Sequence, residues 1–400
     1  MDGSRTLTLA SAVAAARAMV PALAERAAAC EALRRCPDET IAELYASGLM
    51  RMMQPARWGG SELGLDVLLE VVLEMCQGCA STAWVWLNLA THSWNIGQFG
   101  LAAQQDVWQA DPNAVAITGL AFPAGRASAV AGGYRVSGRW PFGSGVDSAQ
   151  WTIVGAPVDR GERGIPGPQE RRFFLLPKVD FRSLDDWRAY GLTGTGSHNV
   201  EVIDAFVPEH RSVLAETFAS GFDCPGAALN PHALYRTPPF AAFGFALGMV
   251  PLGSAKAAVT SYLASAKKRA ATYSGTRLAE LASIQLRIAE ASACVDAAEQ
   301  SLRSDLREFM AMVERHESPS VDARLRWKRN IAFGVTLDLR AVDALMAASG
   351  AGGLTLDAPL QRHFRDVHAA AAHIALTWDV QASAYGQNAL GLPLPPGLLL

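Results

Sequence analysis

The chain has 400 residues, half of them hydrophobic, which is enough to bury a large core in more than one structural unit. Its 35 basic and 38 acidic side chains give a formal net charge of −3, and no basic block stands out. Nucleic acid is therefore not an expected partner, because binding to phosphate backbones depends on clustered basic side chains.

The N-terminus has no basic segment followed by a long apolar run, so we expect no signal peptide and a cytoplasmic protein. The most apolar stretch, 240–253, is short and contains a proline, and it predicts a buried helix rather than a membrane span. Cys76 and Cys79 have a metal-like spacing, but no second pair of ligands follows them. We therefore expect reduced cysteines and no metal site.

Three zones of different texture follow one another along the chain. In 1–112 apolar residues recur at steps of three and four, which predicts a helical domain. In 113–215 glycine, β-branched and aromatic residues alternate in short runs, which predicts a β domain with a polar loop over 159–170. Four Ala-rich amphipathic runs in 216–400 predict long helices, the last of them over 358–387. We therefore expect an α+β fold, mainly α, with a central β-barrel or sandwich and a C-terminal four-helix bundle.

His373 is the first candidate for catalysis, because the predicted last helix places it beside small side chains. Ala369, Ala370 and Thr377 are its neighbours on that face and would leave room for a ligand. A neutral imidazole can take a proton from a phenol or an amine near neutral pH. The alternative is a core histidine that has a backbone or carboxylate partner.

His92 is the second candidate, since it lies in an aromatic stretch with Trp84, Trp86 and Trp94. One histidine among tryptophans can hold a flat substrate by stacking and by one hydrogen bond. A packed helix with a single satisfied polar group fits the same pattern.

Ser144 is the third candidate. It follows Trp140, Phe142 and Gly143 at a glycine-rich strand end, where a backbone can approach a planar ligand closely. An ordinary serine in a turn after a strand is the alternative. The glycine-rich segments 191–196 and 350–353 do not open the helix of a βαβ unit, so neither predicts a Rossmann dinucleotide site.

Over nearly its whole length the chain resembles the acyl-CoA dehydrogenase-like flavoproteins. Segment 55–62 is similar to their N-terminal helix junction, 133–144 to the strand that lies against the flavin ring, and 191–208 to the exit from the β domain. Segment 350–366 is similar to their C-terminal signature. Arg269 resembles an arginine that reaches the flavin of a neighbouring subunit.

Two departures from the dehydrogenase pattern change what this resemblance implies. Where many dehydrogenases carry a catalytic glutamate, the stretch 370–375 has His373 and no carboxylate. The strand end carries Phe142 and Ser144 where dehydrogenases usually have tryptophan and threonine. These features are similar to the flavin-dependent monooxygenases of this fold, in which Ser81–Trp84 followed by His92 also has a counterpart.

This branch implies the oxygenase component of a two-component system and a homotetramer. Reduced FMN or FAD would come from a separate flavin reductase and react with O2 to a C4a-hydroperoxyflavin, which oxygenates a small aromatic such as a phenol, an indole or a polyketide. Ser144 would hydrogen-bond the flavin near N5, His373 would deprotonate or orient the substrate, and His92 would hold its polar end. The expected cofactor contacts are Thr118, Trp140, Phe142, Gly143, Ser144, Arg269, Gly352 and Gly353.

Three alternatives remain. One is an acyl-CoA dehydrogenase or oxidase with a displaced base, for which Glu290 or Glu299 would serve. Another is an N- or S-oxygenase of the same fold. The third is a flavin-binding scaffold without catalytic activity.

Overall fold

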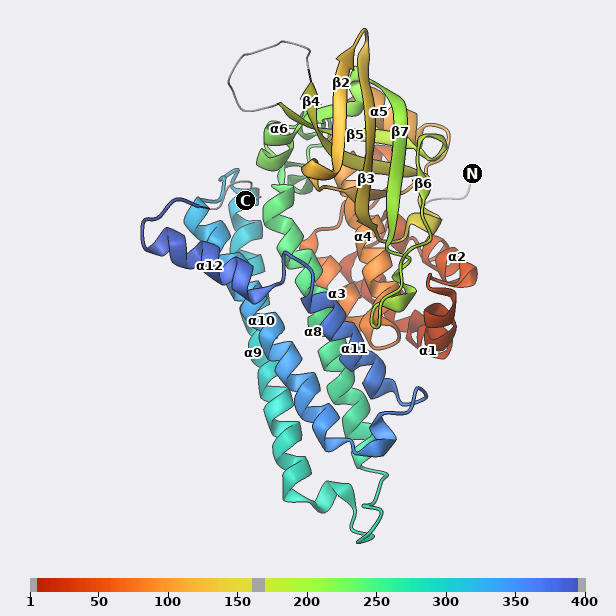
Figure 1. Ribbon diagram of the computed structural model, residues 1–400, viewed down its shortest axis with the longest axis vertical. Helices are drawn as coiled ribbons and strands as arrows, with labels where there is room; N and C mark the ends of the chain where they lie inside the picture. Colours follow the sequence, from red (N-terminus) through yellow and green to blue (C-terminus); the bar gives the residue numbers. More distant parts are fainter. Residues whose placement is uncertain (1–5, 160–169, 395–400) are drawn as a thin grey trace.

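The computed structural model describes residues 6–159 and 170–394, so the expected loop over 159–170 lies almost wholly outside the described residues. A β domain sits at one end of an elongated molecule, and a bundle of long helices extends away from it (Figure 1). The predicted α+β fold, mainly α, is confirmed. The N-terminal helices are α1 (Leu9–Leu33), α2 (Asp38–Ala46), α3 (Leu65–Cys76), α4 (Ala80–Ile96) and α5 (Leu101–Trp108).

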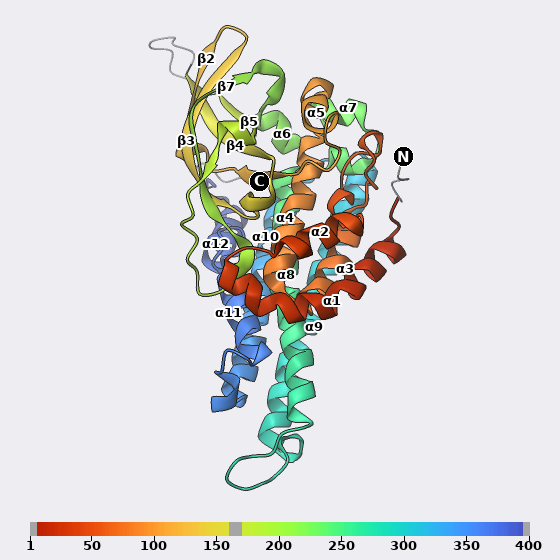
Figure 2. The same cartoon turned by 90° about the vertical axis from the view of Figure 1, so that its right-hand side faces the viewer.

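Helices α1, α2 and α3 lie below most of the sheet, whereas α5 lies beside it (Figure 2). α4 is buried along its whole length and contacts strand β1, helix α8 and the segment 193–195. Because α4 touches all three parts of the fold, side chains on its different faces reach the β domain and the C-terminal helices at once.

The β domain is one sheet with the strand order β6-β7-β3-β2-β4-β5-β8, and β1 pairs in parallel with β4. The strands are β1 (Ala116–Gly119), β2 (Gly125–Val130), β3 (Gly133–Gly143), β4 (Trp151–Asp159), β5 (Arg171–Pro177), β6 (Arg182–Ser183), β7 (His198–Pro208) and β8 (Ser212–Leu214). The end of β3 pairs with the start of β7, where Gly143 lies opposite His198. This register places Ser144, which follows β3, beside Ser197, which precedes β7.

The C-terminal region forms the predicted four-helix bundle from α8, α9, α10 and α11, with α12 packed on α10. Its helices, with two short ones before them, are α6 (Ala215–Ser220), α7 (Pro225–Leu229), α8 (Pro239–Ala266), α9 (Ala282–Glu314), α10 (Val321–Ala348), α11 (Pro359–Ala371) and α12 (Trp378–Ala389). By length and composition α8 could cross a membrane, but 83% of its most apolar window is buried inside the protein. α8 is therefore the core helix of the bundle.

The predicted single helix over 358–387 is wrong, because the chain turns between α11 and α12. His373 lies in that turn and not on a helix. Its carbonyl oxygen accepts hydrogen bonds from the N–H groups of Leu376 and Thr377 and from the Thr377 hydroxyl, while the Ala375 N–H donates to the His373 ring. These bonds satisfy the backbone locally, so the helix ends although the alanine-rich stretch would support its continuation.

Asp366 connects the bundle to the β domain. Its carboxyl oxygen on α11 accepts a hydrogen bond of 2.6 Å from the N–H of Leu192, at the start of the segment that leads to Ser197. The side chain is 2% exposed, and burial raises its pKa to about 7. The folded protein therefore holds the proton of Asp366 more tightly than the unfolded chain does.

We predict that Asp366→Asn changes how stability depends on pH. Because the pKa is raised on folding, the contribution of Asp366 is present below pH 4 and is lost as the pH rises through 7. Asparagine keeps a side-chain oxygen that can accept the hydrogen bond from the Leu192 N–H, but it has no group that ionises. The free energy of unfolding of the variant minus that of the wild type should therefore increase by on the order of 2 kcal/mol between pH 5 and pH 8. Urea denaturation at both pH values measures it, and the exposed Asp357→Asn is the control. A difference that does not change with pH would contradict the prediction.

Candidate functional site

Three separate segments meet at Ser144. From α4, Trp84 donates its indole N–H to the Ser144 hydroxyl oxygen at 3.0 Å. From the segment before β7, the Ser197 hydroxyl lies 2.8 Å from that of Ser144, and the Thr195 hydroxyl lies 2.6 Å from that of Ser197. The Thr195 hydroxyl also donates to the carbonyl oxygen of Leu192 at 2.8 Å. Ser144 is thus the partly exposed end of a chain of three hydroxyl groups whose other two members are buried.

The directions of these hydrogen bonds follow from counting protons. A carbonyl oxygen only accepts, so the single proton of Thr195 is used on Leu192. Thr195 must then accept from Ser197, and Ser197 must accept from Ser144. With its own proton used and the Trp84 N–H received, Ser144 retains a lone pair and no proton. A ligand atom that binds to Ser144 must therefore be a hydrogen-bond donor.

His373 lies next to this chain, between two aromatic rings. Its ring centroid is 6.1 Å from that of Trp84 and 5.8 Å from that of Phe243 on α8. These apolar surroundings lower the pKa of His373 to about 4, so the imidazole is neutral at pH 7. Its Nδ1 accepts the N–H of Ala375 at 3.1 Å, which leaves the proton on Nε2. Of the two roles that the sequence suggests for His373, deprotonating or orienting the substrate, this geometry favours orienting it through a hydrogen bond donated by Nε2.

His92 has the opposite tautomer. Its Nδ1 lies 3.0 Å from the carbonyl oxygen of Ala116 and must carry the proton, and its Nε2 accepts from the Thr118 hydroxyl at 3.1 Å. Burial lowers the pKa of His92 to about 4. Both ring nitrogens are used, so His92 orients Thr118 rather than presenting a free nitrogen to a substrate. Thr118 is partly exposed on β1 and keeps its lone pairs available.

The small residues expected around His373 shape its turn. The Ala370 carbonyl accepts the N–H of His373, and Thr377 closes the turn through its hydroxyl and its N–H. Ala369 packs close to Gly191, where an added Cβ would lie 3.0 Å from the alanine Cβ. Ala370 and Thr377 therefore position His373 through the backbone, and the three residues do not form an open face of a helix.

Two of the expected tryptophans lie inside the core. Trp86 is 0% exposed and donates to the Leu49 carbonyl oxygen, and Trp140 is 0% exposed and donates to the carbonyl oxygen of Gly155. Neither indole lies on a surface that a substrate or a flavin ring can reach, which corrects the expectation drawn from their place among other aromatics. By contrast, Phe142 is 61% exposed at the strand end, where its ring contacts Trp187.

The remaining expected cofactor residues fall into two places. Gly143 ends β3, where an added Cβ would lie 2.8 Å from the side chains of Ile117 and Val200. Arg269, after α8, lies beside the glycine turn before α11, because its guanidinium donates to the Ser349 carbonyl and an added Cβ at Gly352 would lie 3.0 Å from it. Gly353 is buried in the same turn. Arg269, Gly352 and Gly353 thus form one group, separate in the chain from the group around Ser144.

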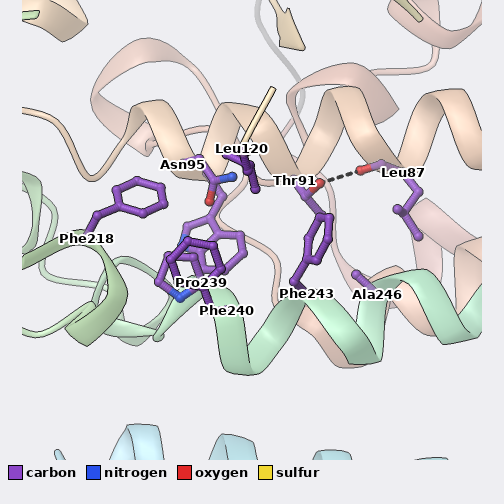
Figure 3. A pocket seen from close by; sticks show the side chains of 10 residues that line it. Leu87, Thr91, Asn95, Leu120, Phe218, Pro239, Phe240, Phe243 and Ala246 are labelled. Atoms are coloured by element: carbon purple, nitrogen blue, oxygen red, sulfur yellow. Dashed lines mark hydrogen bonds between the residues drawn. The ribbon is translucent and has the colours of Figure 1, made fainter. Parts of the chain in front are cut away.

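A cavity lies between α4 and the first turns of α8 (Figure 3). Phe243 lines it and also contacts His373, so the cavity adjoins the site around Ser144. The lining residues are Leu87, Thr91, Trp94, Asn95, Leu120, Phe218, Pro239, Phe240, Phe243 and Ala246. Of the three tryptophans that lie near His92 in the sequence, Trp94 therefore lines this cavity.

Comparison with known proteins places the chain in a family. Residues 9–111 match the model of the acyl-CoA dehydrogenase N-terminal domain, and residues 245–378 match that of the C-terminal domain. The oxygenase component of the FADH(2)-dependent resorcinol hydroxylase of Rhizobium sp. (strain MTP-10005) is 36% identical, over 90% of this chain and 90% of that protein. The chain belongs to the flavin-dependent monooxygenase branch of the acyl-CoA dehydrogenase-like family.

Two further relatives agree with this assignment. The oxygenase subunit HsaA of a flavin-dependent monooxygenase from Rhodococcus jostii (strain RHA1) is 34% identical over 94% of this chain and 97% of that protein. The structure of XiaF from Streptomyces sp. in complex with FADH2 and glycerol superposes with a TM-score of 0.90 at 28% identity, covering 98% of both chains. The predicted fold and family are therefore confirmed.

A dehydrogenase of this family would need a carboxylate base, and the two displaced candidates do not provide one. Hydrogen bonds from Arg340 and Arg287 lower the pKa of Glu290. Burial of Glu299 opposes the same change, but hydrogen bonds from Lys256 and Arg303 still lower its pKa. Carboxylates that are each paired with two cations are weak bases, so the geometry does not favour the dehydrogenase alternative.

The residues around Ser144 fit a reduced flavin. The N5 of a reduced isoalloxazine carries a proton, and Ser144 offers a lone pair and no proton. Ser197 and Thr195 determine the direction in which the Ser144 hydroxyl donates. Neither is among the site residues expected from the sequence. Their signal is the spacing in Thr193-Gly-Thr-Gly-Ser197, which places hydroxyl groups at alternate positions of a glycine turn. Nothing in that pattern says that they face Ser144, because the contact depends on the pairing of β3 with β7.

We predict opposite tautomers for the two histidines at pH 7. Nitrogen-15 NMR of protein with labelled histidine should show the proton on Nε2 of His373 and on Nδ1 of His92, because their partners are an N–H and a carbonyl oxygen respectively. The signals are assigned from the variants His373→Gln and His92→Gln, each of which lacks the signals of one histidine. Both rings should remain neutral down to about pH 5, since burial lowers each pKa to about 4. A proton on Nδ1 of His373 would show that its Nε2 is free to act as a base.

Proposed function

We propose that the protein is the oxygenase component of a two-component flavin-dependent monooxygenase that hydroxylates a small aromatic substrate. Reduced FMN or FAD, when bound, supplies the two electrons that activate O2. One oxygen atom becomes a hydroxyl group on a ring carbon, the other leaves as water, and the flavin leaves oxidised. The acceptor-only hydroxyl of Ser144, beside a neutral histidine and an apolar cavity, is the observation that carries this proposal.

Ser144 would accept a hydrogen bond from the N5–H group of the reduced flavin, and this bond would keep the proton on N5. Its lone pair is available because the Ser144 hydroxyl donates its own hydrogen bond to Ser197. Loss of the N5 proton accompanies the wasteful release of hydrogen peroxide, so a fixed acceptor at this position favours transfer of oxygen to the substrate. Thr118, which is partly exposed on β1, and Phe142, which is exposed at the end of β3, would contact the same ring.

His373 would orient the substrate through its Nε2 proton. A neutral donor between Trp84 and Phe243 can hydrogen-bond a phenol oxygen without adding a charge to the apolar site. His92 would act indirectly by fixing the Thr118 hydroxyl. Trp84 would serve twice, since it donates to Ser144 and packs against the His373 ring.

The group formed by Arg269, Gly352 and Gly353 would bind a flavin phosphate. A guanidinium beside the backbone of a glycine turn suits a phosphate, which accepts hydrogen bonds from both. We assign this group to the flavin of a neighbouring subunit in a homotetramer. A separate flavin reductase would supply the reduced flavin, since the glycine-rich segments carry no dinucleotide fingerprint. We place the protein in the cytoplasm.

The function is tested by mixing the protein and chemically reduced FMN or FAD with a phenol and ¹⁸O2. We expect product that carries one labelled oxygen atom per molecule, with resorcinol as the first probe. The contrasting experiment offers oxidised flavin and an acyl-CoA to the same protein. Reduction of the flavin by acyl-CoA, or a lack of label in every product, would overturn the proposal.

We predict that Ser144→Ala and Ser197→Ala both increase the hydrogen peroxide released per O2 consumed. The first removes the acceptor, and the second leaves the Ser144 proton without its partner, so the hydroxyl can turn. We expect the ratio of product to peroxide to fall about fivefold in Ser144→Ala and less in Ser197→Ala, since a hydrogen bond contributes about 1 kcal/mol. Anaerobic titration with reduced flavin should show weaker binding in both.

Ser148→Ala is the matched control, since this serine lies in the same turn and its hydroxyl takes no part in the chain of three. It should leave both the ratio and the affinity unchanged. Unchanged coupling in Ser197→Ala would contradict the role given to the hydroxyl chain.

A further inference from the structure

The cavity between α4 and α8 contains two polar groups that no residue of the described chain satisfies. The indole nitrogen of Trp94 and the side-chain oxygen of Asn95 are buried and have no hydrogen-bond partner within residues 6–159 and 170–394. Trp94 is 3% exposed and Asn95 is 7% exposed. Figure 3 shows Asn95 projecting from α4 toward Pro239 and Phe240 at the start of α8.

A buried polar group without a partner costs free energy, so two of them lining one cavity point to a ligand. The indole nitrogen only donates and the amide oxygen only accepts. A hydroxyl group is the small uncharged substituent that does both. Thr91, on the same helix face, differs because its hydroxyl already donates to the carbonyl oxygens of Leu87 and Asn88.

The rest of the cavity lining is apolar and uncharged. Phe218, Pro239, Phe240 and Phe243 form much of the wall, and none of its ten lining residues is lysine, arginine or histidine. A carboxylate placed there would lose its hydration without gaining a cation. The lining therefore favours a neutral hydroxyl-bearing group over an anionic one.

We propose that this cavity binds the end of the substrate that lies away from the reacting carbon, and that the substrate is a neutral phenol with a second hydroxyl group. This rests on the proposed function, in which His373 holds the first hydroxyl. Phe243 lines the cavity and contacts His373, so the cavity lies next to the place where the histidine would hold the substrate. Trp94 and Asn95 thus determine specificity.

Three ligands that differ at one position test the proposal. Resorcinol carries a second hydroxyl, 3-methylphenol carries a methyl group of similar size, and 3-hydroxybenzoate carries a carboxylate. Their dissociation constants are measured anaerobically on the protein loaded with reduced flavin. Resorcinol should bind about tenfold more tightly than 3-methylphenol, and 3-hydroxybenzoate should bind at least about tenfold more weakly than either.

Variants then assign the effect to the two residues. Asn95→Leu should weaken resorcinol binding about tenfold and change 3-methylphenol binding less than about threefold. Trp94→Phe, which keeps a ring and removes the N–H, should show the same selectivity for resorcinol. Ser93→Ala is the matched control and should leave both constants within about twofold, because Ser93 does not line the cavity and its hydroxyl donates to the Leu89 carbonyl in its own helix.

The outcomes separate this inference from the proposed function. The inference is overturned if Asn95→Leu weakens the binding of resorcinol and of 3-methylphenol equally. It is also overturned if the wild type binds 3-methylphenol or 3-hydroxybenzoate more tightly than resorcinol. Both results would count even when labelled product forms. The comparison of ligands on the wild type stands if a variant fails to fold. Lack of labelled product from every phenol overturns the proposed function instead, whatever the dissociation constants are.

Discussion

A hydroxyl group has a single proton, and the site depends on where three such protons go. The Leu192 carbonyl takes the proton of Thr195, and the directions of the next two bonds follow from it. The acceptor at Ser144 is therefore determined by a carbonyl oxygen two hydroxyl groups away. Such a chain keeps its direction only while its members stay within hydrogen-bond distance.

Two features of the fold hold these members in place. The register of β3 against β7 brings Ser144 to Ser197, and the carboxyl of Asp366 binds the N–H of Leu192. The first belongs to the β domain and the second to the bundle, so the site lies where the two regions join. A residue on α11 can therefore influence Ser144 without touching it, through the backbone of the segment between Leu192 and Ser197.

Periodicity predicts the architecture well, because amphipathic stripes and alternating strands encode which face is buried. It fails at the turn around His373, where residues on both sides favour helix and the break depends on the Thr377 hydroxyl and on the histidine ring. Composition also cannot tell the side of an element on which an aromatic residue lies. For this reason the sequence does not show that Trp86 and Trp140 lie in the core, whereas Trp94 lines the cavity.

The sequence identifies some of the candidate site residues and misses others. Ser144, Trp84 and His373 could be named from the sequence, and the structure brings them together. Ser197, Thr195 and Asn95 could not, since their importance follows from contacts between segments far apart in the chain and from the lack of a partner for a buried atom. A satisfied and an unsatisfied asparagine look the same in a sequence.

A site with few protons is well matched to oxygen transfer. His92 and His373 have pKa values of about 4 and are neutral at pH 7, so neither supplies a proton readily there. The hydroxyl chain ends on a carbonyl oxygen, which has none to pass on. Because release of hydrogen peroxide requires proton movement and water promotes it, an uncharged, largely apolar site slows that loss. The lack of charge that would protect the reaction would also restrict the substrate, since the cavity lined by Trp94 and Asn95 favours a neutral hydroxyl group over an ionised one.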